Sequence, residues 1–494
     1  MRTPTAARSL AWCSILALPF CAGPASAQPA FRVDGGDDVS SVQSTLVIYE
    51  PFASVGGLIC FGATDAAGNA QLWRSDGTAA GTRKLRDFGN TYPPPGEFAT
   101  VGSSLFFFVE GSLWETDGTA LPVRIAELPA EAFPSSVAVL GSRLFFVIDD
   151  GIHGSELWVS DGTAAGTSIL TDIEPGPEGS APQELTPVGN SLFFLATNTN
   201  GGLALWKTDG TPFGETRVQS LVAPGYGDRL SASLGPLFLF VAADPADALH
   251  PYQLWRSDGT KDGTFVLHVY AGDFVHVCPG SCPPPLAPTD LTPVGDRVFF
   301  VANDGVHGRE LWKTDGTVAG TTLVDDLVPG EAGGIFVRLI AVNDRIVFGV
   351  QGAAADLWSS DGTAAGTRAV PGVPHGPEPG PAYPVGAVGN RVIFVVPGRD
   401  ELFSSDGFAN GTSSLHVFGP PTAGAPTVGG FGTLGNGDVL FFHVDAAGTT
   451  LWKTDGGPPG TTLVDDFATE TGSHRGPVVP VELVRGTREV TRNP

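Results

Sequence analysis

Two short loops place a histidine three residues after an aspartate. They are Asp150–Gly154 and Asp304–Gly308, and both follow the pattern Asp-Gly-(Ile/Val)-His-Gly. A carboxylate and an imidazole at this spacing could bind a metal ion or exchange protons. The same residues also suit a tight turn, in which the aspartate accepts hydrogen bonds from turn amides. Both interpretations stay open, and the turn is favoured.

Acidic residues that end neighbouring apolar segments extend this candidate site. The predicted binding residues are Asp150, His153, Asp172, Asp304, His307 and Asp326. The D-x-D-x-D-G spacing of a calcium loop is missing, so we expect no metal ligands and no cofactor, with Ca²⁺ as an unproven alternative. No G-x-S-x-G, H-E-x-x-H or Walker motif occurs, and no catalytic residue is assigned. Catalytic carboxylates contributed by separate repeats would leave no such motif.

The elements that position these loops are repeats of Leu-Trp-x-(Ser/Thr)-Asp-Gly. Eight copies carry Trp and a ninth carries Phe403; the tryptophans are Trp73, Trp114, Trp158, Trp206, Trp255, Trp312, Trp358 and Trp452. The matching aspartates are Asp76, Asp117, Asp161, Asp209, Asp258, Asp315, Asp361, Asp406 and Asp455. We predict structural roles for both sets, because Asp can bind turn amides and Trp can pack between units.

The repeat length indicates the fold. The copies recur about every 47 residues, the length of a four-stranded propeller blade. Each copy contains four short apolar segments separated by turns, and helical periodicity is absent. The sequence therefore predicts an all-β fold, a β-propeller of about nine four-stranded blades. Two smaller propellers or a β-solenoid are the alternatives.

Composition agrees with strands joined by turns and limits the partners. The 494 residues include 67 Gly and 42 Pro, too many for a helical protein. A net charge of −25 disfavours nucleic acid as a partner. No segment is apolar for the roughly 20 residues that a membrane span needs, so we expect no membrane span. We also expect the protein to be a monomer.

The N-terminus predicts export. A basic start, an apolar stretch and Ala25-Ser26-Ala27 predict a signal peptide over residues 1–27, hence a secreted or cell-surface protein. Anchoring at Cys21 as a lipoprotein is the alternative. Residues 28–44 form an N-terminal segment, residues 45–467 the repeats, and residues 468–494 a tail that could add a closing strand. Cys278 and Cys282 are expected to form a disulfide, and Cys60 to be a buried thiol.

The repeat resembles the ELWxxDGT repeat family of exported bacterial proteins. The resemblance is carried by Glu156–Thr163 and Glu310–Thr317 and covers roughly residues 45–467. It implies export and a propeller-like architecture, but no defined activity. Phe403, Phe408 and Gly457 depart from the pattern.

The loops divide between two faces of the predicted propeller. The Asp-Gly turns join strands 3 and 4 and vary little, whereas the 2–3 and 4–1 loops on the opposite face vary more. We therefore expect a non-enzymatic binding module that recognises an unknown protein or glycan through that face. The alternative is an extracellular glycosidase or lyase, which requires a cluster of Asp, Glu, His, Arg or Tyr at the mouth of the central channel. A purely structural surface protein is a third hypothesis.

Overall fold

The computed structural model describes residues 46–467, apart from residues 130–132, 198–201, 213, 223–229, 245–251, 271–286, 331–332, 354, 377–379, 409–410, 420–426 and 446–447. The described residues form nine antiparallel sheets of four strands, each built from one continuous segment. We number these sheets as blades 1 to 9. The single short helix is the 3₁₀ turn Pro458–Gly460, and no helix in the described part is long and apolar enough to cross a membrane.

The strands of each blade follow one another in sequence. Blades 1 to 3 comprise β1 (Leu46–Val55), β2 (Leu58–Asp65), β3 (Ala70–Ser75), β4 (Arg83–Asp87); β5 (Gly96–Val101), β6 (Ser104–Val109), β7 (Ser112–Thr116), β8 (Val123–Glu127); β9 (Val137–Leu140), β10 (Arg143–Asp149), β11 (Ser155–Ser160) and β12 (Ser168–Thr171). Blades 4 to 6 comprise β13 (Gln183–Val188), β14 (Ser191–Thr197), β15 (Leu203–Thr208), β16 (Thr216–Leu221); β17 (Ser231–Leu234), β18 (Leu237–Ala242), β19 (Tyr252–Ser257), β20 (Phe265–Tyr270); β21 (Thr289–Val294), β22 (Arg297–Asn303), β23 (Arg309–Thr314) and β24 (Thr322–Asp325). Blades 7 to 9 comprise β25 (Ile335–Val342), β26 (Arg345–Gln351), β27 (Leu357–Ser360), β28 (Arg368–Ala369); β29 (Tyr383–Val388), β30 (Arg391–Val395), β31 (Glu401–Ser405), β32 (Ser413–Val417); β33 (Thr427–Thr433), β34 (Val439–Asp445), β35 (Gly448–Thr454) and β36 (Thr462–Asp466).

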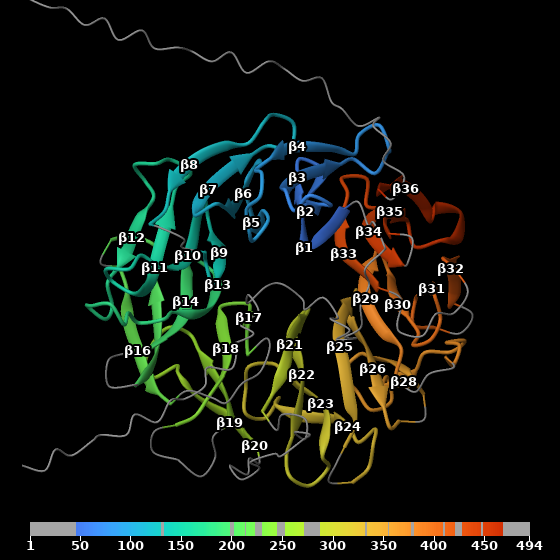
Figure 1. Ribbon diagram of the computed structural model, residues 1–494. Coiled ribbons are helices and arrows are strands. Elements are labelled where there is room, and N and C mark those ends of the chain that lie inside the picture. The colour runs from blue at the N-terminus through green and yellow to red at the C-terminus, as the bar shows by residue number, and fades with distance from the viewer. Residues whose placement is uncertain are drawn as a thin grey trace, which may run out of the picture.

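The nine blades stand in one ring with the first strand of each blade nearest the centre (Figure 1). The prediction of a nine-bladed propeller is confirmed, and the alternatives of two rings or a solenoid do not apply. Contacts between the inner strands of successive blades run around the whole ring. Ring closure hides the faces of the sheets, which a single blade could not do alone.

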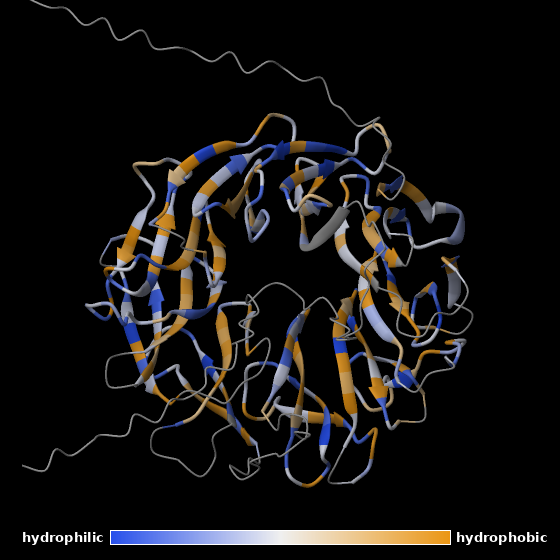
Figure 2. Cartoon of the chain, viewed as in Figure 1, coloured by the Kyte–Doolittle hydropathy of each residue, from blue (hydrophilic) through white to orange (hydrophobic). Residues whose placement is uncertain are grey.

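The core lies between blades. Nine clusters of buried side chains each join two adjacent blades, and hydrophobic bands recur on strands around the ring (Figure 2). In every cluster the Trp of one blade, or Phe403 in blade 8, packs against the preceding blade. Trp312, for example, is 5% exposed and its ring contacts the Tyr270 ring of blade 5 edge-on, with centroids 5.2 Å apart. The repeated Trp thus packs between neighbouring blades.

Side-chain packing and a few hydrogen bonds close the ring between blades 1 and 9. Phe52, Phe61 and Trp73 of blade 1 share a cluster with Leu440 and Phe442 of blade 9. The Ser54 hydroxyl donates to the Thr433 carbonyl oxygen across the same junction, at 2.8 Å. No described strand of one blade pairs with the sheet of another. The predicted closing strand in the tail, and Cys278 and Cys282, lie outside the described residues, whereas Cys60 is a buried free thiol.

The repeated Asp holds the turn between strands 3 and 4. In blade 6 Asp315 Oδ1 accepts hydrogen bonds from the Thr317 amide (2.9 Å) and the Thr317 hydroxyl (2.7 Å). In all nine blades the motif aspartate accepts a hydrogen bond from the amide two residues later. A Cβ on Gly320 would lie 2.1 Å from the Asp315 carboxylate, so a larger residue there would displace this carboxylate from the turn. These contacts give the motif aspartates a structural role.

Candidate functional site

Inner strands of several blades contain a β-bulge opposite a phenylalanine. In β5, β13, β21 and β25, two residues face one residue of the second strand; those facing residues are Phe107, Phe194, Phe300 and Phe348. The first residue of each bulge is charged and has a positive φ: Glu97 (50°), Glu184 (56°), Asp290 (59°) and Arg338 (39°). We call these four residues the bulge residues. They lie at equivalent positions of blades 2, 4, 6 and 7.

A positive φ is costly for residues other than glycine. The equivalent bulge in β33 of blade 9 uses Gly430, with a φ of 66°. Strained backbone of this kind costs about 1–3 kcal/mol per residue and concentrates at functional sites, as β-bulges themselves do. Four blades therefore hold a charged side chain where glycine would be the less strained choice.

The position of the bulges along the strand decides which face they occupy. Glu184 is the second residue of β13, whereas the 1–2 turn follows that strand at Gly189. The bulge residues thus lie nearer the end of the inner strands where the 4–1 loops enter. This end belongs to the loop face that the sequence predicts as the functional one. The bulge residues lie close to the ring centre on that face, not at the tips of its loops.

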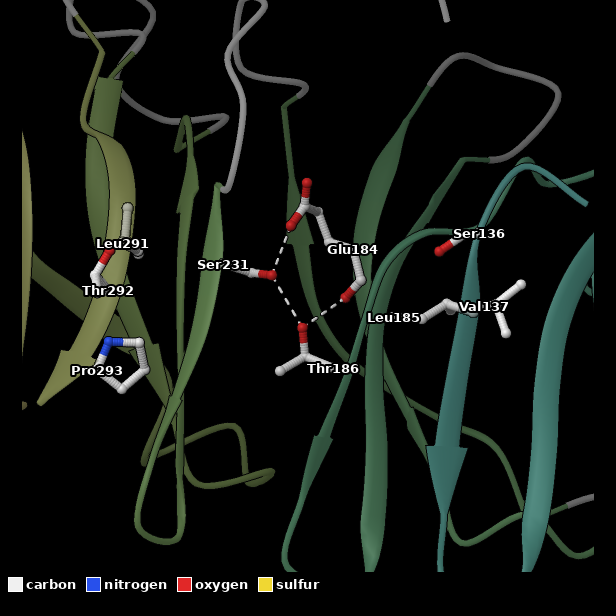
Figure 3. Close-up of a pocket in the computed structure, with 9 residues that line it drawn as sticks. All are labelled: Ser136, Val137, Glu184, Leu185, Thr186, Ser231, Leu291, Thr292 and Pro293. Atoms are coloured by element: carbon white, nitrogen blue, oxygen red, sulfur yellow. Dashed lines mark hydrogen bonds between the residues drawn. The ribbon is translucent and has the colours of Figure 1, made fainter. Parts of the chain in front are cut away.

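A hydrogen-bond network fixes Glu184 between blades 4 and 5 (Figure 3). The Ser231 hydroxyl of β17 donates to Glu184 Oε2 at 2.6 Å, and the Thr186 hydroxyl lies 2.9 Å from the Ser231 oxygen. Thr186 also donates to the Glu184 carbonyl oxygen at 3.0 Å, which supports the strained bulge. Thr292 repeats that last contact in blade 6, where its hydroxyl donates to the Asp290 carbonyl oxygen at 2.8 Å.

A cavity of about 260 Å³ opens beside this network. Its walls come from the inner strands of blades 4, 5 and 6 and from the start of β9 in blade 3 (Figure 3). The polar lining residues are Glu184, Ser136, Thr186, Ser231 and Thr292. The apolar ones are Val137, Leu185, Leu291 and Pro293. Several blades thus contribute to one small site near the ring axis.

Glu97 is the most buried of the bulge residues. It is 8% exposed, and burial alone raises the pKa of its carboxyl group to about 7. Within the part of the chain that the structure describes, no hydrogen bond reaches its side chain. Glu97 lies in blade 2, next to the blade whose Ser136 and Val137 line the cavity. A carboxyl group with this pKa can donate a proton at neutral pH.

Asp290 lies close to a buried guanidinium group. Arg309 at the start of β23 is 7% exposed and its Nη2 donates to the Thr289 hydroxyl at 2.7 Å. Burial lowers the pKa of Arg309, and the negative charge of Asp290 opposes that shift. Asp290 therefore compensates part of the cost of burying Arg309.

The six predicted binding residues form two separate sets, one in blade 3 and one in blade 6. In blade 3, Asp150 Oδ2 lies 2.7 Å from His153 Nδ1, and Asp150 Oδ1 accepts hydrogen bonds from the amides of Ile152 and His153. The hydrogen bond to Asp150 raises the pKa of His153, burial opposes it, and the charges of Asp150 and Asp172 add to the increase. Asp304, His307 and Asp326 repeat this arrangement in blade 6.

These sets have the contacts of turns. Blades 4 and 5 lie between them, so they are two copies of one loop and not two halves of one site. Among the residues that the structure describes, no group of three or more His, Cys, Asp or Glu is arranged to bind a metal ion. The binding role of these six residues remains a prediction.

The glutamate of the repeat motif anchors the 4–1 loop behind each set. Glu310 accepts hydrogen bonds from the amides of Leu327 (3.0 Å) and Val328 (2.8 Å), and Glu156 accepts them from Ser180 and Glu174. Burial raises the pKa of Glu310 to about 7, against the effect of these two amides. The motif thus organises the loop face as well as the 3–4 turn.

The bulge residues escaped the sequence analysis, although a signal was present. The stretches Glu184–Asn190 and Asp290–Asp296 share the pattern acid-Leu-Thr-Pro-Val-Gly-(Asn/Asp). An acidic residue that recurs at the start of the inner strand could have predicted that these two residues lie near the channel. Arg338 and Glu97 lack that pattern and depend on the observed bulges for their assignment.

Neither a family model nor a curated protein matches the sequence. Solved structures do match the fold. A puromycin hydrolase is 15% identical with a TM-score of 0.38 over 73% of this chain and 59% of its own. A prolyl endopeptidase is 15% identical with a TM-score of 0.40 over 67% and 49%, and a puromycin-hydrolyzing peptidase of Mycobacterium tuberculosis is 14% identical with a TM-score of 0.38 over 81% and 58%. The chain therefore spans about half to three fifths of the length of these proteins.

These comparisons contradict the prediction of a non-enzymatic binding module. The matched proteins are named as hydrolases and peptidases, not as non-enzymatic binding modules. The likeness is one of fold, and no substrate or site residue is transferred from the peptidases to this chain. The function is argued below from the chain's own residues.

Proposed function

We propose that this chain is an extracellular propeller enzyme of the glycosidase or lyase type that acts at the mouth of the central channel. One observation carries the proposal: equivalent bulges of four blades hold Glu97, Glu184, Asp290 and Arg338 in strained backbone near the ring centre. An enzyme of this type requires ionisable groups at the channel, and inner strands with only apolar residues and glycine would have argued against it.

Two of the carboxyl groups have complementary surroundings. Glycoside cleavage commonly uses one carboxylic acid that donates a proton and one carboxylate that acts as base or nucleophile. Burial favours the protonated form of Glu97, whereas Glu184 accepts a short hydrogen bond from Ser231. Environments that differ in this way separate acid and base roles. We propose Glu184 as the carboxylate of the cavity and Glu97 as a group able to donate a proton; they lie in blades 4 and 2, with blade 3 between them.

The proposal is tested on the purified chain with a panel of neutral, amino and acidic polysaccharides, by assay of new reducing ends. Glu184→Gln and Glu97→Gln should each lower kcat by at least 100-fold. Glu127→Gln is the matched control, because Glu127 is exposed on the outer strand β8. Absence of activity on every polysaccharide, or full activity of both variants, would refute the proposal.

We further propose that the chain is exported and belongs with the ELWxxDGT repeat proteins. The basic and apolar start with Ala25-Ser26-Ala27 supports export, and Glu156–Thr163 and Glu310–Thr317 support the family. N-terminal sequencing of protein recovered from the medium should begin at Gln28. An intact Met1 in that protein would contradict the signal peptide.

A further inference from the structure

We infer that Val137 is a positioning residue that withholds a hydrogen-bond donor from Glu97 and so favours the protonated form of the Glu97 carboxyl group. The inference rests on the proposed function, in which Glu97 gives up a proton. It goes beyond the bulge itself, because it assigns a role to an apolar residue of the next blade.

Blades 2 and 4 place a glutamate at the same point of the inner strand. Glu97 and Glu184 are each the first residue of a bulge, and each has a positive φ. The residues opposite these two bulges, Phe107 and Phe194, both pair with the motif Trp of their own blade. The two glutamates therefore occupy equivalent backbone positions.

The blade that follows each glutamate has an inner strand without a bulge. Both β9 of blade 3 and β17 of blade 5 pair with the second strand of their blade without a shift of register. Val137 in β9 faces Phe146, and Ser231 in β17 faces Phe240. These two phenylalanines again pair with the motif Trp of their blades. Val137 thus occupies in blade 3 the place that Ser231 occupies in blade 5.

The exchange of serine for valine removes a hydrogen-bond donor. The Ser231 hydroxyl donates to Glu184 Oε2 at 2.6 Å across the junction of blades 4 and 5 (Figure 3). Valine has no side-chain donor, and Val137 packs in the apolar cluster of blades 2 and 3 together with Ala99. Ala99 in turn stands where Thr186 supports the bulge of Glu184. The junction of blades 2 and 3 therefore has the same framework without these two hydroxyl groups.

No charged group on the described strands around Glu97 replaces the missing donor. The strands that pack against β5 are β1, β6, β9 and β10. Their described side chains, which in β1 are those of residues 51–55, include two charged groups, Arg143 and Asp149 at opposite ends of β10. Burial raises the pKa of Glu97 to about 7, without a contribution from a neighbouring charge. Burial and the lack of a donor both disfavour the ionised carboxylate.

The test measures the pKa of Glu97 in the full chain by NMR, with ¹³C at the glutamate carboxyl carbons. The Glu97 signal is the one that is missing from Glu97→Gln. Val137→Thr keeps the branched shape of valine and adds one hydroxyl group, so it should lower this pKa by about one unit. Val137→Ser should shift the pKa in the same direction. Val139→Thr adds the same hydroxyl group to the same strand and cluster at another position, and as the matched control it should leave the pKa unchanged.

The NMR result decides the inference, and the pH profile of the enzyme decides the role of Glu97 in the proposed function. An unchanged pKa in folded Val137→Thr and Val137→Ser, or an equal fall in Val139→Thr, overturns the inference. A lower pKa, with an equal downward shift of the basic limb of kcat/KM on a polysaccharide that the chain cleaves, supports both. A lower pKa with an unmoved pH profile, or with no cleavage of any polysaccharide, supports the role of Val137 and refutes Glu97 as the proton donor of the reaction.

Discussion

Glu97 combines strained backbone with a buried ionisable group. Its φ of 50° strains the backbone, and glycine would relieve that strain. Its exposure of only 8% makes the charged form costly, and a neutral side chain would avoid that cost. Both features reduce the stability of the fold. The pKa of about 7 gives a stability that depends on pH. The folded state prefers the protonated form, since the pKa of an unfolded glutamic acid is about 4.5.

The free energy of unfolding should therefore fall as the pH rises. The stabilisation of the folded state by the protonated Glu97 carboxyl is complete below pH 4.5 and is lost as the pH rises through 7. The free energy of unfolding should change by about 2–3 kcal/mol over this range. Urea denaturation between pH 4.5 and 8 should show a shallower decline for Glu97→Gln than for wild type. Glu127→Gln should follow the wild-type curve, and parallel curves for all three proteins would contradict this account.

Asp315 acts through hydrogen bonds to its own turn. Asp315→Ala removes the acceptor for the Thr317 amide and hydroxyl and should lower the free energy of unfolding by about 1–2 kcal/mol. Asp262→Ala is the control, because Asp262 is an exposed aspartate in the corresponding turn of blade 5. It should change stability by less than about 0.5 kcal/mol. Equal losses in the two variants would argue against the hydrogen-bonded turn.

Between elements, the repeated Trp is a contact of each blade with the preceding one that recurs around the ring. Trp312 of β23 packs against Tyr270 and His268 of β20, with ring centroids 5.2 and 5.1 Å apart. Trp312→Ala should cost about 3–5 kcal/mol, because it leaves a large cavity between blades. Val318→Ala, at a residue that is 60% exposed, should cost far less. Similar losses in guanidinium denaturation would show that Trp312 is not a packing residue.

Glu310 connects β23 to the loop that leads into the next blade. Glu310→Ala should free the amides of Leu327 and Val328, whose hydrogen exchange should accelerate at least tenfold. Glu310→Gln keeps an acceptor oxygen and should retain part of the protection. Unchanged exchange in the alanine variant would show that other contacts hold the loop.

The sequence predicts the repeated elements well and the channel poorly, for a physical reason. Trp312 and Asp315 act within a blade or against its neighbour, so the same chemistry is needed nine times and appears as a motif. The bulge residues lie where different blades converge. Their residue types differ because the neighbours of each bulge differ from one blade to the next. Glu184 meets Ser231 across 47 residues of sequence, and no local pattern records that meeting.

For the whole molecule, the junction of blades 1 and 9 is the place where the ring closes without a connecting loop. A Cβ on Gly432 would lie 2.8 Å from Ile59 Cδ1 and 3.1 Å from Phe52 Cβ, so Gly432→Val should push β33 away from β1. Native-state hydrogen exchange should then show lost protection in blades 1 and 9 before the middle blades. Ala341→Val adds volume at an exposed site on β25 and serves as the control. Uniform loss of protection around the ring would contradict a closure that opens at this junction.

Since each blade is one uninterrupted segment of chain, the number of blades is open to change during evolution. Unequal recombination that copies one repeat of about 47 residues would add a whole blade with both its interfaces, and loss of one repeat would remove a blade cleanly. No strand shared between the first and last blades would have to be rebuilt, because no described sheet includes one. Lineages of this protein should therefore differ in blade number, with the bulge residues of particular blades marking which copies were kept for function.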